Sequence, residues 1–356
     1  MWCTGPKWSR ALAPSLIEPM NICIFGAGAI GGYLAARLLR FTDHQVSVVA
    51  RGEQLQAIQE RGLRLLTPSE DFVVRPHAAT ERAQDLPAQD LVLVTLKAHT
   101  QGAAAADIAH LLSGGGSAVF VNNGIPWWWT YGVESGDSAV ESLPLLDPDG
   151  TLWRQVQPQR VIGCVAYSAN AVVEPGVVRH TANNRWVLGE PNGQDTQRLS
   201  QVVALMRQAG LQAEASDHIR RVVWSKLLRN AAMNSLCALT RLSVDQLAAV
   251  PGMMDLYRAL VQEVATIAAM QGYELNAEAE AAKQVPLLGA AIDGTQGARI
   301  KPSMLQDIEA GRSIEVEAIV GQVQAMARAG GVVTPVLDAI VPMLRALNLA
   351  QGKKSA

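Results

Sequence analysis

The stretch NICIFGAGAIGGYLAARLLR, residues 21–40, decides the fold class. It begins with an apolar run typical of a buried strand and ends with helical periodicity. Between the two, three glycines have the G-x-G-x-x-G spacing, which allows a tight turn, close approach of a pyrophosphate to the main chain, and close helix packing. The stretch therefore predicts a dinucleotide site at the N-terminus of the helix. The residues expected at the cofactor are Gly26, Gly28, Ala29, Ile30 and Gly31.

Apolar runs and helical stretches alternate along the chain after this turn. Strand-like runs occupy residues 45–50, 91–96 and 118–123, and a helical stretch ending in glycine occupies 53–62. Continuous apolar runs are typical of buried parallel strands. The alternation predicts an α/β fold with a Rossmann-type, doubly wound sheet.

The pattern changes close to Ser216, after which helical periodicity dominates. We expect a leader at 1–19, either disordered or preceding a natural start at Met20. A Rossmann domain that binds NADP is expected at 20–215, and an all-α substrate and dimerisation domain at 216–356. Residues 127–160 form an insertion in the first domain. It opens with three tryptophans suited to a lid, core or interface, and continues as a turn-rich surface excursion.

Composition excludes several classes of function. The chain has 356 residues, 49% of them hydrophobic, 17% charged, and a formal net charge of −2. A charge this small, without blocks of basic residues, shows no nucleic-acid or anionic-membrane footprint. The four cysteines lie far apart, which suits a reducing compartment and argues against a disulfide framework or a zinc site. With no run long enough to cross a membrane, we expect a soluble cytoplasmic protein without a metal.

Arg51 stands at the end of the second strand, where NAD enzymes commonly have an acidic residue. A guanidinium fork suits a 2′-phosphate, so Arg51 favours NADP over NAD. The alternative is a surface ion pair between Arg51 and Glu53, which would contribute little to stability.

Polar residues follow two further strands, at the edge where open α/β sheets bind ligands. Lys97 follows the run at 91–96, and Asn123 ends the run at 118–123. Taken singly, the first could be a solvated lysine and the second an ordinary Asn-Gly turn. Together they indicate a site.

A polar seam runs along the predicted helix at 217–241. Lys226, Asn230 and Asn234 recur every four residues and lie on one face. Burying such groups without partners is costly, so they are expected to face a ligand or water.

Two residues of the C-terminal half also have structural explanations. Ser303, with Gln306 three residues later, matches a capping box. Glu315 falls in the first turn of the next predicted helix, where a carboxylate complements the helix dipole.

Five motifs in this order resemble the ketopantoate reductases (2-dehydropantoate 2-reductases) from Met20 to about residue 350. They are GAGAIGGY, VTLKAHT, NNG, WSKLLRNAAMN and PSMLQDIEAGRSIEVEAIVG. The resemblance implies a Rossmann domain, a helical domain, and NADPH reduction of a 2-oxo acid between them. The acid would be 2-dehydropantoate, which is reduced to pantoate in pantothenate biosynthesis.

The resemblance also implies roles for individual residues. Lys226 matches the general acid of the family and Glu315 its partner carboxylate, expected to orient the lysine. Asn230, Asn234 and Ser303 match substrate-binding residues, while Lys97 and Asn123 match residues at the nicotinamide end, with Asn123 also at the substrate. Val244 stands where the family often has another substrate asparagine.

Two alternatives to this function stay open. A dehydrogenase of bulkier D-2-hydroxy acids, using NAD or NADP, could use the tryptophan run to build a wider apolar pocket. A non-catalytic protein that binds NADPH and reports redox state would need the glycine turn and Arg51 but not the polar seam. A homodimer through the apolar C-terminal helices is a further expectation.

Overall fold

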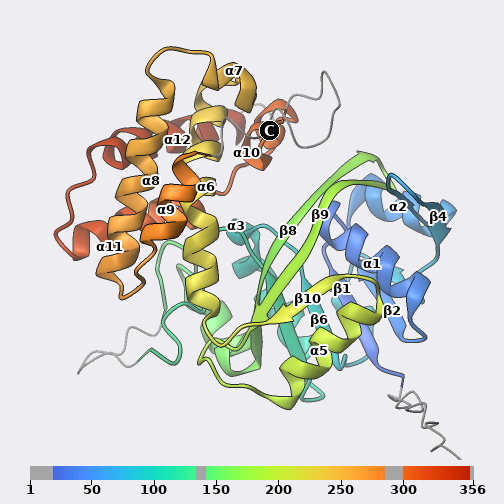
Figure 1. Ribbon diagram of the computed structural model, residues 1–356. Helices are drawn as coiled ribbons and strands as arrows, with labels where there is room; N and C mark the ends of the chain where they lie inside the picture. The colour runs from blue at the N-terminus through green and yellow to red at the C-terminus, as the bar shows by residue number, and fades with distance from the viewer. Residues whose placement is uncertain (1–18, 134–141, 285–299, 353–356) are drawn as a thin grey trace, which may run out of the picture.

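A computed structural model describes residues 19–133, 142–284 and 300–352 (Figure 1). Most of the expected leader, residues 1–18, and part of the insertion lie outside the described residues. In the described part, one large sheet carries helices on both faces, and a group of helices packs beside it. The predicted α/β class is confirmed.

The central strands are the apolar runs that the sequence marks. They form a parallel sheet in the order β5-β2-β1-β6-β7-β8. Their bounds are β1 Asn21–Phe25, β2 Gln45–Val49, β5 Ala79–Thr80, β6 Leu91–Val94, β7 Ser117–Val121 and β8 Val161–Glu174.

The sheet continues beyond β8 through a long hairpin. Strand β9, Val177–Gly189, runs antiparallel to β8 and pairs in parallel with β10, Gln212–Ala215, and with β3, Leu63–Leu66. Strand β4, Asp71–Val74, closes this edge antiparallel to β3. Because β3 returns to β9, helix α1, Ala29–Phe41, contacts strands from both ends of the sheet. The sequence did not predict β3, β4 and β5, which are short and partly exposed.

Helices cover the two faces of the sheet. Side chains alternate across β1, so that Ile22 and Ile24 pack with α1 and α5 while Cys23 and Phe25 face the opposite core. The helices associated with the sheet are α1, α2 Gly52–Arg61, α3 Ala98–Gln101, α4 Ala105–Leu111 and α5 Gln197–Gln208, with 3₁₀ turns η1 Ala83–Asp85, η2 Gly102–Ala104 and η4 Pro158–Arg160.

The chain after β10 is helical wherever the structure describes it. Its elements are α6 Ile219–Thr240, α7 Val244–Ala248, α8 Met253–Met270, α9 Asn276–Lys283, α10 Ser303–Glu309, the π-helical turn η6 Glu317–Gly321, α11 Gln322–Ala329 and α12 Pro335–Gly352. None of the described helices is long and apolar enough to span a bilayer.

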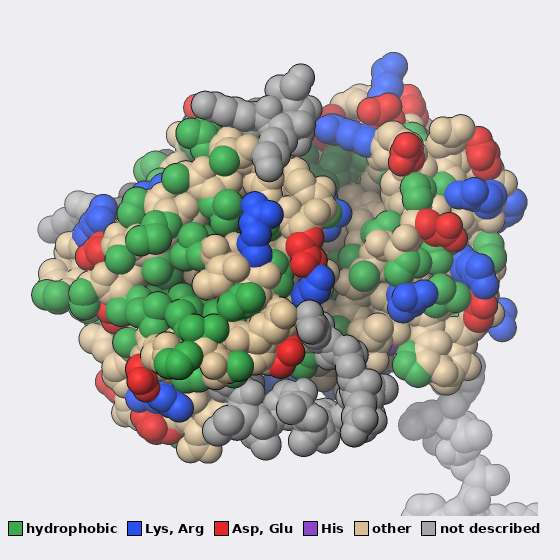
Figure 2. Space-filling view, turned by 90° about the horizontal axis from the view of Figure 1, so that it is seen from above, with side chains coloured by type: hydrophobic (Ala, Val, Ile, Leu, Met, Phe, Trp, Pro, Cys, Tyr) green, Lys and Arg blue, Asp and Glu red, His purple; other side chains and the backbone are tan. Residues whose placement is uncertain are grey.

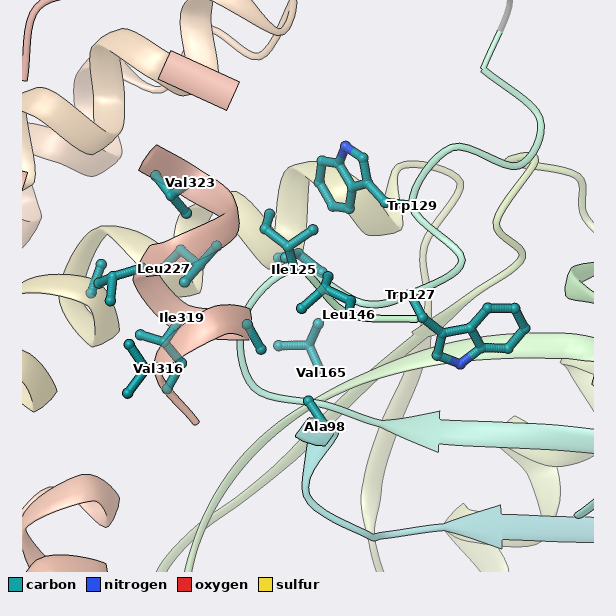
Figure 3. Packing of buried hydrophobic residues seen from close by; sticks show 14 of the residues in the cluster. Ala98, Ile125, Trp127, Trp129, Leu146, Val165, Leu227, Val316, Ile319 and Val323 are labelled. Atoms are coloured by element: carbon teal, nitrogen blue, oxygen red, sulfur yellow. The ribbon is translucent and has the colours of Figure 1, made fainter. Parts of the chain in front are cut away.

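The sheet and the helical group share one apolar core. Ile125, in the loop after β7, lies toward the η6–α11 segment that carries Ile319 and Val323, while Trp127 of the same loop lies over the sheet (Figure 3). Leu227 of α6 joins the same cluster. The position of α6 relative to the sheet is therefore set by hydrophobic packing as well as by chain connection.

The tryptophans of the insertion follow the core alternative, and the described residues of its turn-rich part, 142–150, are partly exposed and partly buried. Trp127, Trp128 and Trp129 are 1–4% exposed, and Leu146 and Leu152 are also buried. A short π-helical turn, η3 Leu152–Val156, follows. These apolar side chains share one cluster with Phe120 of β7 and Ile108 of α4, so this part of the insertion belongs to the core.

Candidate functional site

The glycine turn has the shape of an anion cradle. Gly26 leaves β1 at φ 102°, in the left-handed region. A Cβ on Gly31 would lie 2.0 Å from the carbonyl oxygen of Gly26, so any side chain there would force helix and strand apart. At Gly28 a Cβ would meet no atom within 4 Å, which leaves that side of the turn open. The residues present therefore fit a pyrophosphate lying across the start of α1.

Neighbouring strands hold this turn in place. Thr95, just after β6, donates its hydroxyl to the carbonyl of Gly26 at 2.5 Å. The amide of Gly26 donates to Val49 at the end of β2, and Gln54 of α2 donates to the carbonyl of Ala27. Sequence reasoning overlooked Thr95, although a hydroxyl directly after an apolar strand was a usable signal.

Arg51 lies beside the same edge of the sheet. It precedes α2, its side chain is exposed, and it makes no ion pair with Glu53 or with any other carboxylate in the described part of the chain. The alternative of a surface pair with Glu53 is therefore wrong. A free guanidinium next to the glycine turn is available to a second anionic group.

Lys226 is fixed at the centre of the molecule by two oxygens. Its Nζ donates to the side-chain oxygen of Asn123 at 2.6 Å and to the main-chain carbonyl of Ala166 at 2.6 Å. The first acceptor follows β7 and the second lies on β8, so a lysine from α6 reaches the carboxyl end of the sheet. An ammonium has three N–H donors, and these contacts use two of them.

Burial sets the acidity of this ammonium. The side chain is half-buried, and desolvation lowers the pKa of Lys226 to about 8. The negative charge of Glu315 opposes this decrease. The neighbouring Cys164 is a neutral thiol at physiological pH, because burial raises its pKa to about 12.

Contact with the helical group positions Asn123. The next residue, Gly124, has φ 82° and packs against the main chain of Ala318 in η6. The amide of Ile125 donates to the carbonyl of the same Ala318 at 2.7 Å. The Asn-Gly turn is thus anchored on the π-helical segment, a type of helix distortion that is frequent at functional sites.

Glu315 does not orient Lys226 directly. Its Oε1 accepts the main-chain N–H of Ala98 at 2.9 Å. In the part of the chain that the structure describes, its carboxylate forms no ion pair with Lys226. Glu315 lies two residues before η6 rather than in the first turn of a regular helix. Burial raises the pKa of its carboxyl group.

Lys97 also bridges the two halves of the molecule. Its Nζ lies 2.7 Å from the carboxylate of Asp307 and 3.0 Å from the carbonyl of Ser313. Asp307 also pairs with Arg312 at 3.0 Å. Lys97 therefore follows β6 at the sheet edge and also forms an ion pair with Asp307, which the sequence did not predict.

The outer end of the polar seam meets α10. The side-chain oxygen of Asn234 accepts the hydroxyl of Ser303 at 3.2 Å and the amide of Met304 at 3.1 Å. Pro302, not Ser303, is the N-cap residue, so the predicted capping box at Ser303 is wrong. Asn234 instead caps α10 by accepting the amide of Met304, 70 residues away in the chain. The amide of Asn230 is half-buried and makes no side-chain hydrogen bond with any described residue.

A furrow separates the two lobes of the molecule. Figure 2 shows the helical lobe and the sheet lobe separated by a hollow, with acidic and basic side chains near its rim. One cavity, of about 270 Å³, is lined by Ala98, Glu315 and Ala318, where the sheet meets the helical group, and a second, of about 350 Å³, lies at Glu190 and Arg220. Lys226 lines neither of them.

Comparison with known proteins agrees with this arrangement. The family model "Ketopantoate reductase PanE/ApbA" matches residues 22–193, and its C-terminal counterpart matches 218–348. A 2-dehydropantoate 2-reductase from Mesorhizobium japonicum is 40% identical, covering 94% of this chain and 99% of the relative.

Two solved structures have the same fold. A candidate ketopantoate reductase from Ralstonia solanacearum is 35% identical, with a TM-score of 0.82 and coverage of 94% of this chain and 99% of that one. A D-mandelate dehydrogenase, solved with NADH and anilino(oxo)acetate, is 20% identical with a TM-score of 0.76 and coverage of 93% and 99%. The family-model matches and the 40% identity show that this chain belongs to the ketopantoate reductase family of oxidoreductases.

Proposed function

We propose that this protein reduces 2-dehydropantoate to pantoate with NADPH, as a step of pantothenate biosynthesis. The observation that carries the proposal is the hydrogen bonding of the buried Lys226 ammonium. Two of its N–H groups are bound to Asn123 and Ala166, which leaves one for a substrate oxygen. The name of the 40% identical relative, a 2-dehydropantoate 2-reductase, supports the substrate.

The nicotinamide, when bound, supplies the hydride that reduces the carbonyl carbon of the 2-oxo acid. Negative charge then develops on the carbonyl oxygen. Lys226, held in place beforehand, stabilises that charge and transfers its third proton to the oxygen. The resulting neutral amine regains a proton from solvent, and a pKa of about 8 suits both steps near neutral pH.

The remaining seam and edge residues are assigned to binding. Asn123 keeps the ammonium aimed, and the free amide of Asn230 is available to the substrate carboxylate. Ser303 and Asn234 hold the outer end of the site through their mutual hydrogen bond. Glu315 has one oxygen bound to Ala98, and its other oxygen is assigned to the hydroxyl group of the substrate.

For the cofactor, the open face of the glycine turn supports a dinucleotide and the unpaired Arg51 supports the 2′-phosphate of NADPH. Lys97 is assigned to the nicotinamide end of the sheet. To contact the nicotinamide, its ammonium group would have to leave the ion pair with Asp307.

The experiment is an assay of NADPH oxidation with 2-dehydropantoate. Replacing Lys226 with alanine is expected to lower kcat about 100-fold or more, while NADPH binding and folding persist. Arg229→Ala, an exposed position on the same helix, is the control and should keep activity. Retained turnover in Lys226→Ala would remove the lysine from the mechanism.

The competing functions are tested in the same assay. A dehydrogenase of bulkier D-2-hydroxy acids would oxidise NADPH faster with an aryl 2-oxo acid than with 2-dehydropantoate. The tryptophans that this alternative needs for a wider pocket are instead buried in the apolar core, which weakens it. Cofactor binding without oxidation by any 2-oxo acid would favour a redox reporter.

Organisation and location complete the proposal. We place the boundary between a cofactor domain and a substrate domain near residue 216, between β10 and α6. The three described cysteines are free and buried, which supports a cytoplasmic location. A homodimer through α12 is proposed because that helix exposes an apolar stripe, consisting of Pro335, Ala339, Pro342, Met343, Ala346, Leu349 and Ala350.

A further inference from the structure

Tyr167 is an aromatic neighbour of Lys226 that lies outside the residues assigned to proton transfer and binding. It lies on β8, directly after Ala166, whose carbonyl accepts a hydrogen bond from Lys226. The ring centroid of Tyr167 is 5.6 Å from the Nζ of Lys226. Helix α6 and strand β8 contact each other at this point, beneath the helical group in Figure 1.

The phenol is a neutral group at the pH at which the protein works. Burial raises the pKa of the Tyr167 hydroxyl above its usual value. Its oxygen makes no hydrogen bond with any side chain or main-chain group in the described ranges. What Tyr167 presents to the ammonium is therefore the negative face of an aromatic ring, without a charge.

The charged groups around Lys226 differ from the Tyr167 ring in how they act on the ammonium. Glu315, before η6, is the carboxylate that attracts the ammonium, and Cys164 on β8 is neutral. Arg185 on β9 lies 5.1 Å from the Tyr167 ring, but its charge is paired with Glu214. The charge of Arg229 on α6 acts on Tyr167, and the charges of Lys97 and Asp307 act on Glu315.

We propose that the ring of Tyr167 is a positioning element for the general acid, which keeps Lys226 charged and aimed despite its burial. The inference rests on the proposed role of Lys226. A cation within about 6 Å of an aromatic face gains enough free energy to raise its pKa by roughly half a unit. The ring thus opposes the desolvation of Lys226 from the side of the sheet, as Glu315 does from the helical side.

The test compares Tyr167→Phe, which keeps the ring, with Tyr167→Met, which keeps an apolar side chain of similar length. The proposal expects Tyr167→Met to move the basic limb of the kcat/KM profile to lower pH by roughly half a unit. Tyr167→Phe should leave that limb unchanged. Tyr131→Met, which removes a ring that packs on Trp153 away from Lys226, is the matched control and should also leave it unchanged.

The direction of the shift separates this role from a structural one. If Tyr167 only excluded water, Tyr167→Met would admit water and raise the pKa of Lys226 toward 10.5. A rise, an unchanged limb, or equal shifts in the Phe and Met variants would overturn the proposal.

A second readout does not need turnover. The Cε chemical shift of Lys226 in ¹³C-lysine-labelled protein, assigned by its loss in Lys226→Arg, reports the same titration without substrate. If the protein does not reduce 2-dehydropantoate, this titration still decides whether Tyr167 acts on Lys226. A downward shift in Tyr167→Met but not in Tyr167→Phe is the expected result.

Discussion

Gly124 packs against the main chain of Ala318 so closely that a Cβ at Gly124 would lie 2.1 Å from the carbonyl oxygen of Ala318. This contact joins the turn after β7 to η6, and the residue before Gly124 is Asn123, which holds Lys226. The sheet and the helical group therefore meet at the residue next to Asn123, the hydrogen-bond partner of the proposed general acid.

Replacing Gly124 with alanine is expected to destabilise the protein and slow the reaction. The left-handed backbone and the collision together should cost about 2–5 kcal/mol of unfolding free energy. Displacement of Asn123 should lower kcat about tenfold or more, because proton transfer depends on alignment. Chemical denaturation and steady-state kinetics measure the two effects.

Gly252 provides a matched control, with φ 81° and no atom within 4 Å of an added Cβ. Gly252→Ala should cost only about 1–2 kcal/mol and leave kcat unchanged. If both variants behaved alike, backbone strain alone would explain Gly124, and the contact with Ala318 would have no positioning role.

The unpaired Arg51 predicts cofactor preference. Losing a charge-assisted hydrogen bond of about 1.5–3 kcal/mol should weaken NADPH binding about 10- to 150-fold in Arg51→Ala, with little change for NADH. Binding titrations with both cofactors check this result. Arg61→Ala, at the far end of α2, is the control, and equal weakening of NADH and NADPH by Arg51→Ala would contradict the role of a 2′-phosphate.

The reaction rate should fall in alkaline solution. Only the ammonium form of Lys226 can donate a proton, and its pKa is lowered to about 8. The value of kcat/KM should therefore be highest below pH 8 and fall about tenfold for each pH unit above it. A profile that stays flat to pH 10 would mean that another group donates the proton.

The same lowered pKa predicts a pH-dependent stability. Between pH 8 and 10.5 the unfolded chain keeps a proton on Lys226 that the folded protein has lost. Folding therefore becomes more favourable as the pH rises through this range, and below pH 8 the buried charge is a constant cost.

Lys226→Met removes this dependence. The stability of the wild type relative to Lys226→Met should increase from pH 8 to 10, measured by urea denaturation at several pH values. An unchanged difference across that range would show that the folded protein does not lower the pKa of the lysine.

The sequence predicts elements better than contacts between distant residues. The strands β1, β6 and β7 are buried on both faces, so each appears as an almost continuous apolar run, and Ser47 alone interrupts the buried part of β2. Short β5 and the half-exposed β4 have no such pattern, and their pairing depends on strands far away in the chain.

The candidate site shows the same limit. The spacing of Lys226, Asn230 and Asn234 correctly places them on one helix, α6. It gives no information on their partners, because Asn123 is 103 residues from Lys226 and Ser303 is 69 residues from Asn234. For the same reason Ser303 was predicted to cap its own helix, a local rule that a distant side chain overrides.

The exposed stripe of α12 predicts self-association. Its seven apolar residues fall within about a third of the helix circumference at 100° per residue, and Met343 and Leu349 are 55% and 65% exposed. Such a continuous apolar face is typical of an interface between subunits. Met343→Asp should therefore convert a dimer to a monomer in sedimentation experiments at micromolar concentration, because a carboxylate buried in the interface lacks a partner.

Val73, on the edge strand β4, is also 55% exposed, so Val73→Asp is the control and should not change the mass. A wild-type protein that sediments as a monomer at these concentrations would exclude the α12 interface.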